Sequence, residues 1–241
     1  MNPGNDHTAF REYIEHKKVV FVGACPNLLG KKMGEKIDSY DVVVRSNNFW
    51  RPMNDDLIPD YGKRCDVLYV NNQYLRETQP FPTAEMKVKG IKWICFKGCN
   101  PVKLKIYNSV ISSRTYSKII PEVSKVLPSA TAGLYLAIDL LNQNPDELYY
   151  TGVDFFASRK PVFEHNNYQE YLPGYLPDNI REQGNKINAG KTKDGHDFFG
   201  NAKYFYKLFQ ENVNFKSDDF ILDLLYGIAN GKIKQGEIKW Q

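Results

Sequence analysis

Short apolar runs that alternate with helical patterns constrain the fold of this chain more than any other feature. The run Val19–Val22 is closed by Gly23, which is typical of a strand buried on both faces of a parallel sheet. Similar runs predict strands over Asp41–Arg45, Cys65–Gln73, Gly90–Gly98 and Asp146–Phe156. Helical patterns occupy Lys31–Ile37, Ser129–Asn142, Asn201–Gln210 and Asp218–Ala229. The alternation predicts an α/β fold, a single Rossmann-like domain over residues 1–241 with three layers and a mostly parallel sheet.

Composition places the chain among globular proteins that fold in water. Of its 241 residues, 42% are hydrophobic and 25% are charged, and no apolar run approaches the ~20 residues that span a bilayer. The polar N-terminus lacks the apolar core of a signal peptide. The four cysteines, Cys25, Cys65, Cys95 and Cys99, show no zinc-binding pattern and are expected to be reduced. We therefore expect a cytoplasmic protein with no membrane partner.

The loops after the first two strands indicate what kind of ligand the sheet binds. Doubly wound sheets bind ligands beyond the carboxyl ends of their strands. A dinucleotide site would show G-x-G-x-x-G after the first strand and an acidic residue after the second. The chain has Gly23 and then Gly30, and its second strand ends in Arg45-Ser46-Asn47-Asn48. NAD is therefore disfavoured, and no P-loop pattern occurs. Amide side chains donate and accept hydrogen bonds, which suits a sugar or a pyrimidine edge.

The same segment resembles the large sialylmotif of glycosyltransferase family 29, the eukaryotic-type sialyltransferases. That motif reads V-V-G-N-S-G-N-L, then a Gly, then E-I-D-x-x-D-x-V-x-R-x-N. Here Val22–Leu28 reads VGACPNL, Gly34 follows, and Glu35–Asn47 reads EKIDSYDVVVRSN. The similarity continues into Asp60–Gln73, DYGKRCDVLYVNNQ, where the family has D-V-G-x-K-T.

A second segment resembles the small sialylmotif of that family. There P-S-T-G opens a helix, and a strand ending in Y-G follows. Here PSATAG, Pro128–Gly133, opens the predicted helix, and LYYTGVDFF, Leu148–Phe156, supplies the strand. Independently of the family, the hydroxyls of Ser129 and Thr131 at a helix N-terminus suit a phosphate or carboxylate.

Two histidines follow in the order of the remaining family motifs. FEHNNY, Phe163–Tyr168, is loosely similar to the third motif, with His165 as the candidate. GHDFFGN, Gly195–Asn201, matches the His of the last motif, H-x-x-x-x-E, at His196 but has Asn201 in the place of Glu. In the family the last His is the general base, so the resemblance implies catalytic roles for His196 and His165.

The resemblance also implies the fold, the donor site and the chemistry. The fold would be the GT-A-like variant of the sialyltransferases. The reaction would be metal-independent, inverting transfer from a pyrimidine nucleotide-sugar, similar to CMP-sialic acid, to a hydroxyl acceptor. No D-x-D metal motif follows a strand, so we expect neither metal nor cofactor. The implied donor-binding residues are Gly23, Ala24, Cys25, Asn27, Asn47, Ser129, Ala130, Thr131, Gly152 and Asp154.

The departures from the family leave alternatives open. Ala24 and Cys25 replace the Asn and Ser of the large motif, and the family's bridging cysteines are absent. Without a membrane anchor, the chain is similar to a soluble bacterial, phage or viral relative. The acceptor is either a glycan or, as the net charge of +4 permits, modified DNA. In the DNA alternative, a phage enzyme adds a sugar such as arabinose from a UDP-sugar to a hydroxymethylated base. A non-catalytic nucleotide-sugar-binding protein is the third alternative.

Residues 159–194 differ from the rest of the chain. They are polar, rich in Gly, Pro and Asn, and weakly periodic. A stretch of this length inside a compact domain is usually an active-site lid or a disordered loop. Composition does not indicate the oligomeric state.

Overall fold

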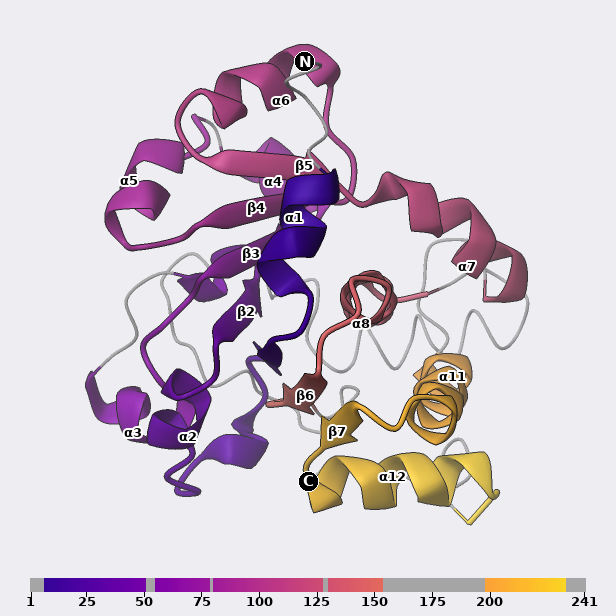
Figure 1. The fold of residues 1–241 in the computed structure, drawn as a ribbon. Helices are drawn as coiled ribbons and strands as arrows, with labels where there is room; N and C mark the ends of the chain where they lie inside the picture. The colour runs from indigo at the N-terminus through magenta and orange to yellow at the C-terminus, as the bar shows by residue number, and fades with distance from the viewer. Residues whose placement is uncertain (1–6, 51–54, 79, 128–129, 154–197, 233–241) are drawn as a thin grey trace.

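A seven-stranded, wholly parallel sheet forms the centre of the molecule (Figure 1). The computed structural model describes residues 7–50, 55–78, 80–127, 130–153 and 198–232. The strands are β1 Lys18–Val22, β2 Val42–Ser46, β3 Val67–Val70, β4 Trp93–Phe96, β5 Ser112–Thr115, β6 Glu147–Thr151 and β7 Phe215–Ser217. Their order is β5-β4-β3-β2-β1-β6-β7. The chain thus builds outward from β1 to β5 and then returns to the other side of β1.

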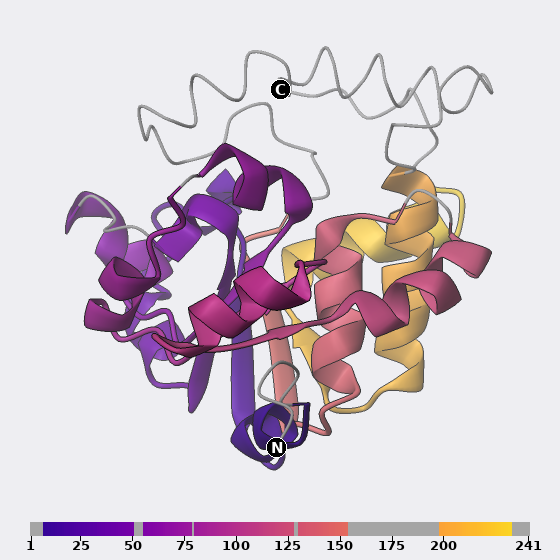
Figure 2. The ribbon, with the colours of Figure 1, turned by 90° about the horizontal axis from the view of Figure 1, so that it is seen from above.

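Helices cover both faces of this sheet, as Figures 1 and 2 show. Val19 and Phe21 of β1 face one core, and Val20 and Val22 face the other, because successive side chains of a strand alternate. The first core is shared with α1 His7–Ile14, α7 Ile120–Val126, α8 Ala132–Leu141, α11 Phe198–Glu211 and α12 Asp219–Ala229. The opposite face is covered by α2 Gly34–Asp38, α3 Ile58–Tyr61, α4 Asn72–Glu77, α5 Thr83–Val88 and α6 Pro101–Asn108.

The α/β prediction with a parallel sheet in three layers is confirmed. None of the helices in the described ranges is both long and apolar enough to cross a bilayer. No disulfide joins any of the four cysteines.

Several predicted element boundaries are wrong, each for a local reason. The helix predicted from Lys31 begins at Gly34, because the N–H groups of Gly30 and Lys32 donate to the Asp60 carboxylate at 2.7 and 2.8 Å and hold a loop there. The third strand ends at Val70, since Asn71 already caps α4. The helix predicted from Ser129 begins at Ala132.

A buried polar network explains why β5 escapes prediction. Its sequence, SSRT, is polar, yet Ser113 and Arg114 are buried. The Arg114 guanidinium pairs with the Asp139 carboxylate of α8, which also accepts a 2.5 Å hydrogen bond from the Tyr69 hydroxyl. The Arg114 guanidinium carbon lies 3.9 Å from the centroid of the Phe10 ring of α1. A buried charge is stable only when paired, so this network holds β5, β3, α8 and α1 together.

Several residues of the segment that resembles the large sialylmotif hold α2 and α3 against β2. A Cβ on Gly34 would lie 2.1 Å from the Ile58 carbonyl oxygen, so α2 and α3 can touch only through glycine. The Arg45 guanidinium is buried and donates to the carbonyls of Tyr61, Gly62 and Arg64 at 2.7, 3.0 and 2.7 Å. These contacts fix the α3 turn against β2.

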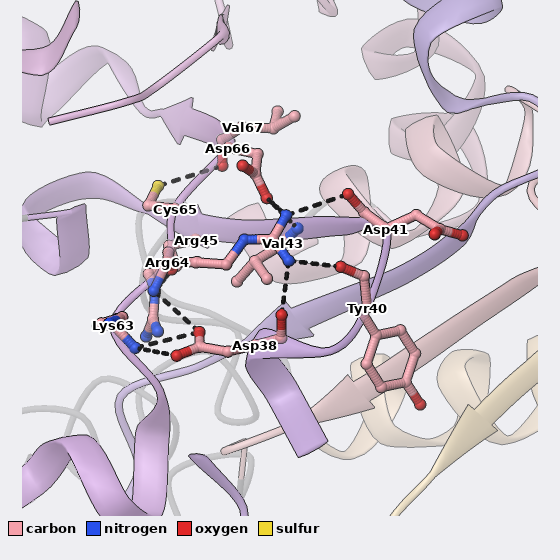
Figure 3. Close-up of polar contacts among 10 residues, drawn as sticks. All are labelled: Asp38, Tyr40, Asp41, Val43, Arg45, Lys63, Arg64, Cys65, Asp66 and Val67. Carbon is pink, nitrogen blue, oxygen red and sulfur yellow. Dashed lines mark hydrogen bonds and ion pairs between the residues drawn. The ribbon is translucent and has the colours of Figure 1, made fainter. Parts of the chain in front are cut away.

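Figure 3 shows how the same turn is tied to the amino ends of β2 and β3. The Asp38 carboxylate accepts from the backbone N–H groups of Lys63 and Arg64 at 2.9 and 3.0 Å. The Arg64 guanidinium donates to the carbonyls of Asp38 and Tyr40 at 2.6 and 2.7 Å and pairs with Asp66 at 2.7 Å. These motif residues therefore act at the edge of the sheet opposite the carboxyl ends of the strands.

Gly34→Ala is expected to lower the free energy of unfolding in urea by about 1–3 kcal/mol, because the new methyl group meets rigid backbone atoms. Gly98→Ala is the matched control. A Cβ there would lie 3.5 Å from its nearest neighbour, which is ordinary contact. Equal stability of the two variants would contradict the close packing of α2 on α3.

Candidate functional site

The sheet changes winding direction between β1 and β6, and their carboxyl ends lie side by side (Figure 1). The Gly23 N–H donates to the Thr151 carbonyl and the Cys25 N–H to the Gly152 carbonyl, both at 2.9 Å. Beyond this pair, Ala24 packs against the core on the α2 face of the sheet and Val153 against the core on the opposite face. Such a switch point is where doubly wound sheets bind ligands. Three of the segments singled out from the sequence, at Gly23, Asn47 and Gly152, lie along this edge.

Gly23 and Gly152 are glycines because they touch each other. A Cβ on Gly23 would lie 2.3 Å from the Gly152 carbonyl oxygen, and a Cβ on Gly152 would lie 2.5 Å from the Gly23 carbonyl oxygen. Gly152 also has a φ of +66°, which disfavours any residue with a side chain. At both positions the missing side chain therefore serves the contact between the two loops.

The loop after Gly23 is held from both sides and contains a buried acceptor without a hydrogen-bond partner among the described residues. The Tyr61 hydroxyl donates to the Cys25 carbonyl at 2.6 Å, and Ala24 packs against the core on the α2 face. Asn27 lies in the short helix Pro26–Leu28. Its Oδ1 atom is buried and has no hydrogen-bond partner among the described residues. Buried acceptors are nearly always satisfied, so Asn27 Oδ1 suits an N–H or O–H group of a ligand.

Asn47 has a defined structural role at the end of β2. Its φ is +52°, a conformation that Asn tolerates better than most residues. Its Oδ1 accepts the Asn71 N–H at 3.1 Å, and Asn71 Oδ1 in turn accepts the Tyr74 N–H at 2.7 Å as the cap of α4. We expected Asn47 to offer a ligand both a donor and an acceptor. Its oxygen already accepts the Asn71 N–H within the fold, so its NH₂ group is the part that suits a ligand.

The start of α8 forms the other wall of the switch point. Thr131 is the N-cap, and its Oγ1 accepts the Leu134 N–H at 3.3 Å. Ala130 is buried just before it. The first N–H groups of a helix lack intrahelical partners, and at α8 these belong to Ala132 and Gly133. The helix end therefore presents N–H groups and a partial positive charge at the carboxyl edge of the sheet, an arrangement that suits an anion.

Asn201 supports this turn. The residue is fully buried in α11, and its Oδ1 accepts the Thr131 N–H at 2.8 Å. The sequence places Asn201 where the family's last motif has Glu, close to the predicted base. The structure shows instead that its oxygen joins α11 to the N-cap of α8.

Sequence reasoning missed two residues of this region. Tyr150 of β6 is 1% exposed, and its hydroxyl lies 2.7 Å from where a Cβ on Gly133 would be. Lys97 follows β4, with its Nζ 4.8 Å from the centroid of the Tyr135 ring of α8. Burial lowers the pKa of the Lys97 ammonium group. Neither residue stands out in sequence: Tyr150 is part of an apolar strand, and Lys97 is one of many lysines.

The remaining predicted residues are not placed. Ser129, Asp154, His165 and His196 lie outside the described residues, as does the segment 159–194. Within the described ranges, no three His, Cys, Asp or Glu side chains gather in a way that could hold a metal ion.

Comparison with known proteins gives a distant likeness at the level of structure. No protein-family model and no curated protein matches the chain. One similar structure is the sialyltransferase CstII from Campylobacter jejuni in complex with a substrate analogue, cytidine-5'-monophosphate. It has 17% identity and a TM-score of 0.43, and the match covers 59% of this chain and 63% of that one, less than two thirds of its length. Another is a mammalian sialyltransferase in complex with Gal-beta-1-3GalNAc-ortho-nitrophenol, with 16% identity, 71% coverage of both chains and a TM-score of 0.44. At these scores the likeness carries no argument about function.

Asn47→Ala should lower the free energy of unfolding by about 1–3 kcal/mol, because it removes the acceptor of the Asn71 N–H and leaves an aliphatic residue at positive φ. Asn47→Gly should cost less, since glycine tolerates this conformation. Asn47→Asp keeps the acceptor and should stay near the wild type. Urea unfolding of the three variants checks this order, and a stable Asn47→Ala would contradict it.

Asn201→Ala should lower the free energy of unfolding by about 1–3 kcal/mol, because the partly buried Thr131 N–H loses its acceptor. Lys203→Ala, an exposed change on the same helix, is the control and should stay within about 0.5 kcal/mol of the wild type. If both variants unfold like the wild type, Asn201 does not hold the α8 cap.

Proposed function

We propose that the protein is a metal-independent, inverting glycosyltransferase that uses a pyrimidine nucleotide-sugar, similar to CMP-sialic acid, and a hydroxyl acceptor. One observation carries the proposal. The loop Gly23–Asn27, Asn47 and the turn that Thr131 caps, which are far apart in sequence, lie at the carboxyl edge of one parallel sheet around its switch point. These are the segments for which the resemblance to family 29 implies donor binding.

The polar groups at this edge fit the parts of a pyrimidine nucleotide. Asn27 Oδ1 requires a donor, which a ribose hydroxyl or the amino group of cytosine supplies. The NH₂ group of Asn47 suits a carbonyl or hydroxyl oxygen. The first turn of α8 and the Thr131 hydroxyl suit the phosphate. Lys97 adds a cation that makes no ion pair with a carboxylate among the described residues.

The reaction is a single displacement at the anomeric carbon. His196 takes the proton of the acceptor hydroxyl, because an imidazole is a base near neutral pH. The acceptor oxygen then bonds to the anomeric carbon while the bond to the phosphate oxygen breaks and its electron pair stays on the phosphate. Helix dipole and hydrogen bonds stabilise the charge that develops there. His165 is proposed to contact the leaving phosphate, and residues 159–194 to close over the donor.

CMP or UMP should raise the melting temperature of the wild type, whereas AMP and NAD should not. At a concentration of 100 times Kd a ligand adds about 2.7 kcal/mol of stability, which for a chain of this size corresponds to about 5–10 °C. Asn27→Ala should lose this response without becoming less stable, because its oxygen has no partner to lose. A purine response equal to the pyrimidine response, or no response at all, would contradict the proposed donor.

A further inference from the structure

Lys97 carries a positive charge that the fold does not neutralise. Among the lysines of the described ranges, only Lys97, directly after β4, and Lys17, directly before β1, are half-buried, and the others are exposed. Lys97 forms no ion pair with a carboxylate in the described part of the chain. Burial lowers the pKa of its ammonium group. Since a partly buried charge costs free energy until it is paired, this ammonium group suits an anion that the described chain does not supply.

Backbone and side chain hold this charge in one place. The Lys97 N–H donates to the Val70 carbonyl at 2.8 Å and so continues the pairing of β4 with β3. Its Nζ lies 4.8 Å from the centroid of the Tyr135 ring, and the hydroxyl of that buried tyrosine is hydrogen-bonded to Ser124 Oγ at 2.9 Å. An aromatic ring attracts a cation without neutralising it. The ring thus positions the ammonium group and leaves its charge available to a ligand.

Lys97 lies at the carboxyl edge of the sheet, some way along from the switch point. The strand order β4-β3-β2-β1 puts it three strands from the end of β1, roughly 14 Å at the usual spacing of strands. Asn47 contacts Asn71 at the end of β3. The exposed Asn72 lies beside Gly98, because a Cβ on that glycine would be 3.5 Å from Asn72 Oδ1. Polar groups therefore continue along this edge from β2 to β4.

This part of the edge lies where a second substrate would be expected. In an inverting displacement the acceptor enters opposite the leaving phosphate, so its site adjoins the donor site without coinciding with it. A lysine ammonium group is a compact point charge, and together with a neighbouring amide it suits one carboxylate or phosphate group. A single half-buried cation also differs from the several phosphate contacts with which proteins bind nucleic acid.

We propose that Lys97 and Asn72 form an acceptor subsite that binds an acidic group of a saccharide, so that the enzyme selects anionic over neutral acceptors. The cation that Lys97 adds at this edge then serves the acceptor and not the donor phosphate. This inference rests on the proposed function for its choice of the acceptor, whereas the binding of an acidic sugar can be measured without turnover.

The reactivity of Lys97 reports whether the subsite is occupied. Acetic anhydride acylates neutral amines, and a bound anion favours the charged ammonium form, so an acidic ligand slows the reaction. Labelling would be followed by peptide mass spectrometry with galactose, galacturonate, a galactose phosphate monoester, CMP or a short DNA duplex. We expect one of the two acidic sugars, at ten times its Kd, to slow labelling about tenfold, and galactose and CMP to have no effect. The exposed Lys92, at the amino end of the same strand, is the internal control.

Lys97→Met removes the charge and keeps the unbranched stem. We expect its affinity for the protecting sugar to fall by about 10- to 100-fold in calorimetry, the range of one hydrogen bond to a charged group. Lys97→Arg keeps the charge and should retain most of the affinity, and Lys92→Met is the matched control that should bind as the wild type does. The urea midpoint of Lys97→Met should equal or exceed that of the wild type, because the fold gives this ammonium group no counter-ion to lose.

The other outcomes overturn the inference. Equal protection by galactose means that charge is not selected, protection by CMP assigns Lys97 to the donor phosphate, and protection by DNA alone assigns it to nucleic acid. The same holds if no ligand protects Lys97, if Lys97→Met binds the acidic sugar as the wild type does, or if its urea midpoint clearly falls. Nucleotide release without protection of Lys97 refutes this inference alone. Protection without release from any nucleotide-sugar refutes the proposed function and leaves a binding site for acidic sugars.

Discussion

The contact between Gly23 and Gly152 is the constraint on which the site depends. Parallel pairing of β1 with β6 brings the two loops together, and each glycine leaves room for the carbonyl of the other. The segment after β1 then turns toward Tyr61, whose hydroxyl donates to the Cys25 carbonyl. A side chain at either position would separate the strand ends and displace both walls of the switch point.

The segment that resembles the large sialylmotif divides into two parts with different physical roles. Gly34, Asp38 and Arg45 hold α2, α3 and β2 together, through close packing and hydrogen bonds to the backbone of the α3 turn. Asn27 and Asn47 lie at the carboxyl edge, where ligands bind. Most of the matching residues therefore bear on how the strands and loops are held together, and few bear on which donor binds.

Apolar strands were predictable because burial on both faces leaves a continuous apolar run, as in Val19–Val22. β5 was not predictable, since the buried charge of Arg114 pairs with Asp139, which is distant in sequence. The helix predicted from Ser129 begins later because Thr131 makes the cap of α8. The positions of Asn201 and Tyr150 beside the start of α8 could not be predicted from the sequence. What each contacts depends on how α11 and β6 pack against α8, and no local sequence pattern encodes that packing.

Release of nucleotide from activated sugars tests the central claim most directly. The wild type would be incubated with CMP-, UDP-, GDP- and ADP-sugars, with water as the acceptor, and free nucleotide would be followed by chromatography beside a His196→Ala variant. The account predicts slow release from a pyrimidine nucleotide-sugar that does not require added metal and that falls by about 10²–10⁴-fold in the variant. Release from purine nucleotide-sugars alone, or equal release by both proteins, would contradict it.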